Sequence, residues 1–299
     1  LEDLIEITGP ARAAELNVIL REQARVIDIN RKRKRLLTTR GSLFYDKLII
    51  ATGAQQTALT CQGNAEDDVL QINDLVSYQR LRKQLSRPGM RISIIGAGLI
   101  GCELAEDLTT GGHEVTLLER NSLPLSQLLP KTLAESLRQH LCARGIQFIS
   151  NASLTAIKKD KDQFFTLEYS RHESIQADVI ISALGLLPNT RLARKAGLEY
   201  QRGIIANPHT MQTSDKDIYV LGDCAQIHQQ CYAYIEPIHR QAETIAAALS
   251  GDILPFVERQ PLIRVKTPSL PLAICPPSSH LHLSLIHISG PTRLRRISY

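Results

Sequence analysis

The feature that most constrains the fold of this chain is a glycine-rich turn with a strand pattern before it and a helix pattern after it. Residues 96–101 read Gly-Ala-Gly-Leu-Ile-Gly, which is the G-x-G-x-x-G spacing. The apolar run Arg91–Ile95 predicts a short buried strand, and apolar residues at helical spacing follow between Leu104 and Leu108. In that context the motif predicts a β-α-β unit of the Rossmann type that binds a dinucleotide. A glycine-rich turn without a ligand is the alternative.

Each glycine of the motif has its own physical role. Gly96 permits the tight turn, Gly98 lets the backbone approach a pyrophosphate at the helix N-terminus, and Gly101 allows close packing of helix on strand. Glu119 ends the next strand, 18 residues after Gly101. A carboxylate there accepts a hydrogen bond from a ribose 2′-OH and repels a 2′-phosphate, which favours NAD over NADP. Arg120 beside it weakens that preference.

Further patterns complete this unit. Helical spacing recurs over residues 73–87 and 131–144, and residues 154–181 alternate like antiparallel strands. We therefore expect a complete Rossmann domain with a small β-insert over residues 71–190.

The segment before this unit predicts strands of a different kind. Residues 24–29 and 35–39 read as an antiparallel hairpin, and Tyr45–Ala51 as a buried strand. The basic run Arg31–Arg35 lies at the tip of the hairpin. It is interpreted as a solvated tip, with a docking patch as the alternative.

The segment after the unit resembles a continuation of that first part. Ile218–Leu221 predicts a buried strand that ends at Gly222 and Asp223. Pro237–Leu249 predicts a helix with proline in its first turn, and residues 261–277 are strand-like. The two flanks therefore look like pieces of another domain, into which the Rossmann unit is inserted.

Composition excludes several classes of protein. The net charge is +5, but residues 280–299 contribute three arginines and no acid, so the rest of the chain carries only +2. That charge is too small to indicate a nucleic-acid partner, and no recognition motif for one is present. No apolar run reaches the roughly 18 residues that a membrane span needs. There is no secretory signal pattern, so we expect a cytoplasmic protein.

Cysteine and histidine spacing argues against a disulfide framework or a metal site. None of the six cysteines forms a C-x-x-C pair. The histidines of residues 1–279 lack metal-ligand spacing, and the pair His280 and His282 lies in an atypical tail. Reduced thiols and no bound metal are expected.

Three strand-to-turn motifs, taken together, carry a family resemblance. They are residues 45–54, 181–189 and 213–225, in that order around the G-x-G-x-x-G segment. The combination resembles the FAD-dependent pyridine nucleotide-disulfide oxidoreductases, which hold FAD in one domain and NAD(P)H in an inserted one. The resemblance covers residues 1–278.

Within that superfamily, residues 72–75, 98–103 and 265–268 most closely resemble the rubredoxin–NAD reductases. The resemblance implies transfer of a hydride from NADH to FAD, followed by single-electron transfer to rubredoxin or a similar small electron-transfer protein. A ferredoxin or flavorubredoxin reductase is the alternative enzyme. A non-catalytic NAD-binding module is the alternative of a different class.

The resemblance also implies which residues contact the cofactors. Those expected at the flavin nucleotide, or where it meets the nicotinamide, are Val26, Thr52, Gly53, Glu103, Gly185, Gly222, Asp223, Ile235 and Lys266. Val26 would contact the adenine through its backbone, and Asp223 would accept a hydrogen bond from the ribityl chain. Glu103 and Lys266 are the two expected at the reacting rings.

Simpler roles compete with three of these assignments. Asp223 follows a buried strand through a glycine, but it is also explained as a loop carboxylate. Glu103 is also explained by favourable pairing with the helix dipole. Lys266 is also explained as a solvated lysine at a strand end.

The expected fold class is therefore α/β, with a Rossmann-type NAD domain inserted in an incomplete FAD domain. The expected segments are FAD domain 1–70, NAD domain 71–190, FAD domain 191–258, the start of an interface domain 259–278 and a non-native tail 279–299. The chain has one G-x-G-x-x-G only, so an N-terminal segment that holds the FAD pyrophosphate is expected to be missing. We accordingly expect the 299-residue chain to bind NADH and retain little FAD, and the tail to be dispensable.

Overall fold

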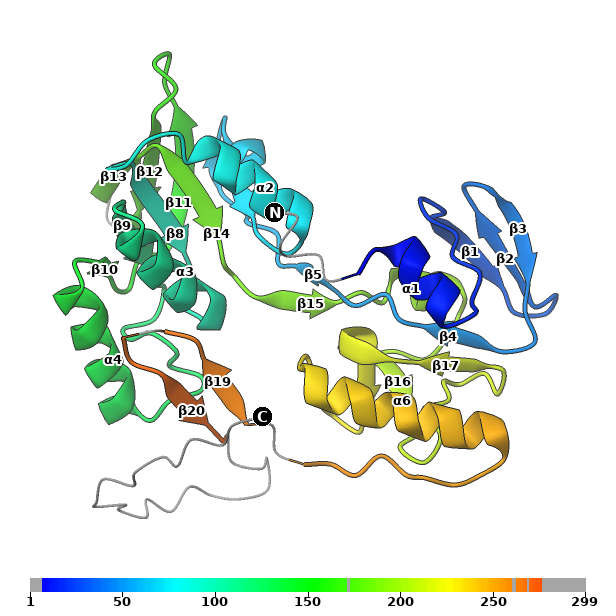
Figure 1. Ribbon diagram of the computed structural model, residues 1–299. Coiled ribbons are helices and arrows are strands. Elements are labelled where there is room, and N and C mark those ends of the chain that lie inside the picture. The colour runs from blue at the N-terminus through cyan, green and yellow to red at the C-terminus, as the bar shows by residue number, and fades with distance from the viewer. Residues whose placement is uncertain (1–6, 171–172, 260–261, 268, 276–299) are drawn as a thin grey trace. The chain divides into compact units, whose positions relative to one another are not determined.

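A computed structural model describes residues 7–170, 173–259, 262–267 and 269–275 (Figure 1). The expected tail, residues 279–299, lies outside the described residues. Contacts divide the chain into two compact units. Unit 1 comprises Leu1–Thr60 and Leu184–Val257, and unit 2 comprises Cys61–Ala183 and Glu258–Tyr299.

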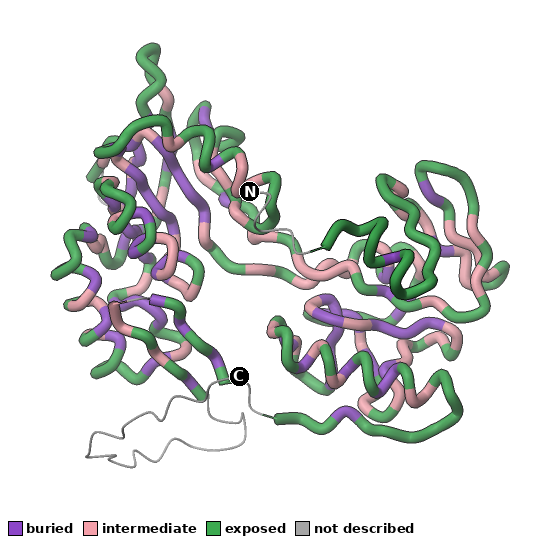
Figure 2. Tube along the Cα trace, in the orientation of Figure 1, coloured by how far each residue is buried: buried purple, intermediate pink, exposed green. Residues whose placement is uncertain are grey.

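Unit 2 contains the β-α-β arrangement that the glycine motif predicts. Its main sheet is wholly parallel, in the order β10-β9-β8-β14-β7. The strands are β7 (Leu70–Gln71), β8 (Arg91–Ile95), β9 (Glu114–Leu118), β10 (Gln147–Ile149) and β14 (Val179–Ser182). The helices are α2 (Leu75–Gln84), α3 (Leu99–Thr110) and α4 (Lys131–Ala143). The strands β8 and β14 are buried over nearly their whole length because both lie in the interior of the sheet (Figure 2).

Two smaller sheets complete unit 2. The first has the order β13-β12-β11-β6 and matches the expected β-insert. Its strands are β6 (Gln62–Gly63), β11 (Leu154–Lys159), β12 (Phe165–Tyr169) and β13 (Glu173–Ala177), and a 3-10 turn, η2 (Glu66–Asp68), follows β6. The second is the antiparallel pair β19 (Ile263–Val265) and β20 (Leu272–Ile274).

Unit 1 is built from short strands, short helical segments and one longer helix, α6. Its strands are β1 (Val26–Asn30), β2 (Arg35–Thr38), β3 (Gly41–Phe44), β4 (Leu48–Ile50), β5 (Ala54–Gln56), β15 (Leu186–Pro188), β16 (Ile204–Ala206), β17 (Ile218–Val220) and β18 (Ala225–Ile227). Its helical segments are α1 (Gly9–Glu15), α5 (Arg191–Lys195), η4 (Gly222–Cys224) and α6 (Ile235–Ser250). The parallel pair β4–β17 brings the two flanks of the chain together in one core, as the sequence predicts.

Helix α6 shows how local sequence sets an element's ends. Pro237 lies in its first turn, where a missing backbone N–H costs nothing. Gly251 ends the helix with a φ of 88°, in the left-handed region that glycine adopts readily. Its buried face carries Pro237, Gln241, Thr244 and Ile245, at helical spacing.

The boundaries between the two units, as defined by residue contacts, differ from the domain boundaries expected from the sequence. Residues 61–70 group with unit 2 because β6 and β7 pair with its sheets. Residues 184–190 group with unit 1 because β15 pairs with β5. The C-terminal pair β19–β20 groups with unit 2. Short strands of this kind carry too weak an alternation to be placed from sequence.

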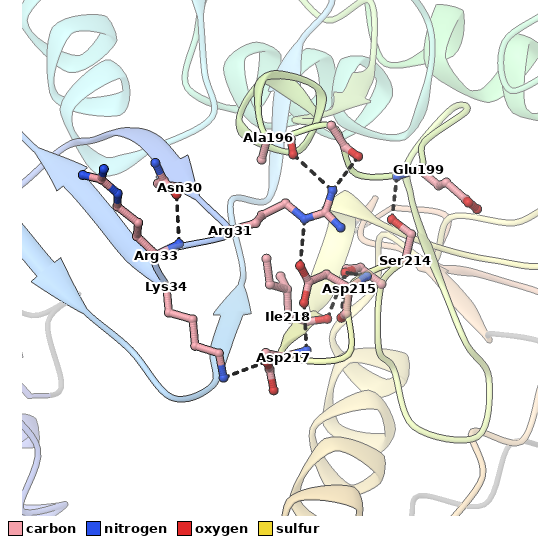
Figure 3. Close-up of polar contacts among 12 residues, drawn as sticks. Asn30, Arg31, Arg33, Lys34, Ala196, Glu199, Ser214, Asp215, Asp217 and Ile218 are labelled. Carbon is pink, nitrogen blue, oxygen red and sulfur yellow. Dashed lines mark hydrogen bonds and ion pairs between the residues drawn. The ribbon is translucent and has the colours of Figure 1, made fainter.

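The basic run at the hairpin tip makes ion pairs within unit 1 (Figure 3). Arg31 Nε donates to Asp215 Oδ2 at 2.7 Å, and the same guanidinium donates to the carbonyl of Gly197 at 2.9 Å. Lys34 Nζ lies 2.7 Å from Asp217 Oδ2, and Lys47 Nζ lies 2.7 Å from Asp217 Oδ1. The ion pairs of Arg31 and Lys34 attach the β1–β2 hairpin to the turn before β17, a structural role that neither sequence interpretation included.

This cluster predicts how unit 1 responds to acid. Hydrogen bonds from Lys34 and Lys47 lower the pKa of Asp217 to about 2, from an ordinary value of 3.8. Because the folded pKa lies below the unfolded one, the stabilisation is complete above the unfolded value and is lost as pH falls from about 4 to about 2. We expect Asp217→Asn to flatten the acid limb of thermal unfolding in that range. Asp46→Asn, at an exposed carboxylate with no ion pair among the described residues, should leave the limb unchanged.

Candidate nucleotide-binding site

The glycine loop between β8 and α3 has the geometry of a phosphate-binding turn. Gly96 has a φ of 105°, which favours glycine. A Cβ on Gly101 would lie 1.9 Å from the carbonyl oxygen of Gly96, so the loop can close on the helix only with glycine there. Gly98 caps the N-terminus of α3, and among the described residues no side chain accepts a hydrogen bond from the first amides of the helix.

Gly98 differs from its neighbours in a way that points to a ligand. Its backbone is extended, with a φ of −77°, and a Cβ built there meets no heavy atom within 4 Å. The fold itself therefore does not require glycine at this position. Open space in front of unsatisfied helix N-terminal amides fits a bound phosphate, since those amides and the helix dipole favour an anion.

Glu119 follows directly after β9 and faces this loop. Its side chain is buried, with 8% of its surface exposed. Its Oε2 accepts a hydrogen bond from the backbone N–H of Ala97 at 2.8 Å. The carboxylate that was expected to select the ribose is thus held against the glycine loop, while Arg120 beside it is exposed. The NAD site residues expected from the sequence lie together in unit 2.

Cys102, in the first turns of α3, is a structural thiol. It is fully buried, and its Sγ donates to the carbonyl of Ala97 at 3.6 Å. Burial, together with the charges of Glu119 and Glu103, raises the pKa of Cys102 to about 12. A thiol with such a pKa is not a nucleophile at neutral pH.

The structure also brings Glu103 and Lys266 together, from segments far apart in sequence. Glu103 Oε1 accepts a hydrogen bond from the backbone N–H of Lys266 at 2.7 Å. One turn later on α3, Glu106 Oε1 accepts from the N–H of Ser269 at 2.9 Å. The side chain of Lys266 is exposed. The two carboxylates attach the segment after β19 to helix α3.

Unit 1 carries the other expected site residues. Asp223 lies in η4, directly after β17, and burial raises its pKa. Within the described part of the chain, no hydrogen bond or ion pair to its carboxylate is found. Gly222 has a φ of 80° and donates its N–H to Gln241 Oε1 at 2.8 Å.

Gln241 is a residue that the sequence reasoning missed. It is fully buried on α6, and its Nε2 has no hydrogen-bond partner among the described residues. A buried unpaired amide is costly, and this one is retained where its side-chain oxygen accepts the N–H of Gly222. The sequence signal for Gln241 is that a polar residue lies on the apolar face of α6. Asp223 gives unit 1 an acceptor that fits a hydroxyl group of a flavin nucleotide.

The remaining expected residues are placed as follows. Thr52 Oγ1 donates to the carbonyl of Asn189 at 3.0 Å, and the carbonyl of Gly53 accepts from the N–H of Asn189 at 2.9 Å. Gly185 has a φ of 90°. Val26 begins β1 and packs against the core of unit 1, whereas Ile235 begins α6 and is 76% exposed.

Two other features, a membrane-spanning helix and a metal-binding cluster, are not found in the described ranges. Within the described ranges, no helix is long and apolar enough to cross a membrane. The same ranges contain no group of three or more histidine, cysteine or acidic side chains that could hold a metal ion.

Comparison with known proteins identifies the family. The family model for pyridine nucleotide-disulphide oxidoreductases matches residues 6–250. The rubredoxin-NAD(+) reductase of Acinetobacter baylyi is 37% identical over 78% of this chain, which spans 59% of that relative's length. The nitric oxide reductase FlRd-NAD(+) reductase of Vibrio vulnificus is 36% identical over 95% of this chain and 74% of its own.

Solved structures of known reductases are also similar to this chain. The covalent complex of putidaredoxin reductase with putidaredoxin is similar, with a TM-score of 0.82 and 27% identity over 89% of this chain and 66% of that one. A ferredoxin reductase from Rhodopseudomonas palustris has a TM-score of 0.80 and 25% identity over 87% of this chain and 65% of that one. The expected α/β fold class and the expected resemblance are confirmed. This chain belongs to the pyridine nucleotide-disulphide oxidoreductase family.

Proposed function

We propose that the chain serves an FAD-dependent NADH oxidoreductase that passes electrons through FAD to rubredoxin. The observation that carries the proposal is the open position at Gly98, in front of the N-terminus of α3, with Glu119 beside the same loop. A pyrophosphate at the loop and a ribose hydroxyl at the carboxylate are the two groups that NADH would present there.

Residues of this chain would hold the nucleotides, while the cofactors supply the redox chemistry. The chemistry supplied by FAD would be acceptance of a hydride from NADH and release of single electrons. Asp223 would accept a hydrogen bond from a ribityl hydroxyl. Lys266 would place a positive charge beside the flavin, with its backbone fixed by Glu103. Val26, Thr52, Gly53, Gly185, Gly222 and Ile235 are proposed to border the same cofactor.

The choice of rubredoxin as acceptor is supported by the names of the relatives, which include rubredoxin-NAD(+) reductases and FlRd-NAD(+) reductases. A ferredoxin or flavorubredoxin reductase is the alternative enzyme. NADH-dependent reduction of rubredoxin, ferredoxin and flavorubredoxin, compared at equal concentrations, distinguishes them. A colourless preparation that binds NADH and reduces no acceptor would instead indicate a non-catalytic NAD-binding module.

The proposal also includes a cytoplasmic location for the protein.

The first test is nucleotide preference. We expect NADH to bind at least about tenfold more tightly than NADPH, a difference of roughly 1.4 kcal/mol, because Glu119 repels a 2′-phosphate. Glu119→Ala should narrow the difference. Fluorescence titration of the two nucleotides measures it. Equal affinities in the unsubstituted protein would contradict the assignment of Glu119.

A further inference from the structure

The carboxylate of Glu119 is nearly saturated with hydrogen bonds. Its Oε2 accepts from Ala97 N–H at 2.8 Å. Its Oε1 accepts twice from Asn121, from the backbone N–H at 2.9 Å and from side-chain Nδ2 at 2.8 Å. A carboxylate offers about four acceptor positions, so three are used and about one is left for a ribose hydroxyl.

Asn121 is itself well anchored. Its backbone carbonyl accepts a hydrogen bond from the N–H of Asn151 at 3.0 Å, just beyond β10. The orientation of its side chain follows from chemistry, because an ionised carboxylate only accepts hydrogen bonds and the NH₂ end of the amide must therefore face it. The donor is thus fixed in position on one side of Glu119, opposite the glycine loop.

We propose that Asn121 is a positioning residue for nucleotide selection: its side-chain amide holds the Glu119 carboxylate between the glycine loop and the ribose. The inference rests on the proposed binding of NADH to unit 2. Without this donor the carboxylate gains rotational freedom, and the exposed guanidinium of Arg120 is free to compete for it. Both effects weaken the contact with the 2′-OH and the repulsion of a 2′-phosphate.

Asn121→Asp tests this role sharply because it keeps the shape and replaces the donor with an acceptor. The introduced carboxyl group would lie where Nδ2 now lies, 2.8 Å from Glu119 Oε1. Two carboxylates at this distance share a proton, because both do not readily ionise side by side. At lower pH the introduced group donates its O–H to Glu119 and imitates the amide. At higher pH it repels Glu119 from the loop.

The experiment is fluorescence titration of NADH and NADPH on the 299-residue chain at about pH 5 and about pH 8, where the shared proton is favoured and disfavoured, respectively. For Asn121→Asp, NADH affinity should fall about tenfold between the two pH values, equivalent to about 1.4 kcal/mol. For Asn121→Ala, the NADH to NADPH affinity ratio should fall about threefold at both pH values, equivalent to about 0.6 kcal/mol.

The matched control is Asn151→Asp. Asn151 is exposed and has a φ of 54°, a conformation that aspartate also tolerates, and it contacts Asn121 only through the backbone. The Asn151→Asp substitution adds the same charge at a side chain that makes no hydrogen bond to Glu119 among the described residues. We expect it to keep the unsubstituted affinity ratio and pH response.

The outcomes separate this inference from the proposed function. If the unsubstituted chain prefers NADH and both Asn121 variants keep its ratio and pH response, the positioning role is wrong and the proposed function stands. If the unsubstituted chain binds neither nucleotide, the proposed function itself fails. Should Asn121→Asp not fold, the affinity ratio of Asn121→Ala decides the question alone.

Discussion

Gly98→Ala is expected to lower the affinity for NADH about a hundredfold, a loss of about 2.7 kcal/mol, without changing thermal stability. The backbone at Gly98 suits any residue, and an added Cβ meets no protein atom within 4 Å. The protein should therefore fold normally. The methyl group would occupy the space that a pyrophosphate needs in order to reach the amides at the N-terminus of α3.

Two measurements check this prediction. NADH titration gives the affinity, and thermal unfolding followed by circular dichroism shows whether the fold is intact. Glu119→Ala is a useful comparison, because it should change nucleotide preference more than it changes NADH affinity. An NADH affinity within about threefold of the unsubstituted protein, a difference of less than about 0.6 kcal/mol, would show that the loop does not bind the pyrophosphate.

Gly101→Ala, three residues further along, is expected to act on stability instead. A Cβ there would lie 1.9 Å from the carbonyl oxygen and 3.1 Å from the carbonyl carbon of Gly96. The backbone of Gly96 cannot move freely, because its N–H donates to the carbonyl of Leu118 at 2.8 Å. The backbone of Gly101 cannot move freely either, because α3 continues from this residue. Forcing the loop and helix apart should cost about 3 kcal/mol.

Thermal unfolding distinguishes the two alanine variants. For a unit of this size, that cost should lower the melting temperature of unit 2 by roughly 10 °C. Gly98→Ala serves as the matched control, since it makes the same chemical change in the same loop without a collision. Equal melting temperatures for the two variants would contradict the packing role of Gly101.

The sequence determined the parts of this protein whose cause is local. A strand, a glycine turn and a helix follow one another within 20 residues, so β8, the loop and α3 could be predicted together. The position of Glu119 followed from the same reasoning, because the next strand must end at the same edge of a parallel sheet. The proline and glycine that bound α6 are local signals too.

The tertiary structure alone decided the contacts between segments that are distant in the chain. The pairing of Arg31 with Asp215, the hydrogen bond from Lys266 to Glu103 and the buried amide of Gln241 at Gly222 depend on how separate elements pack. A charged or polar residue does not indicate its partner, because solvent and many other groups satisfy it equally well in the unfolded chain. Only packing removes those alternatives and makes one partner necessary.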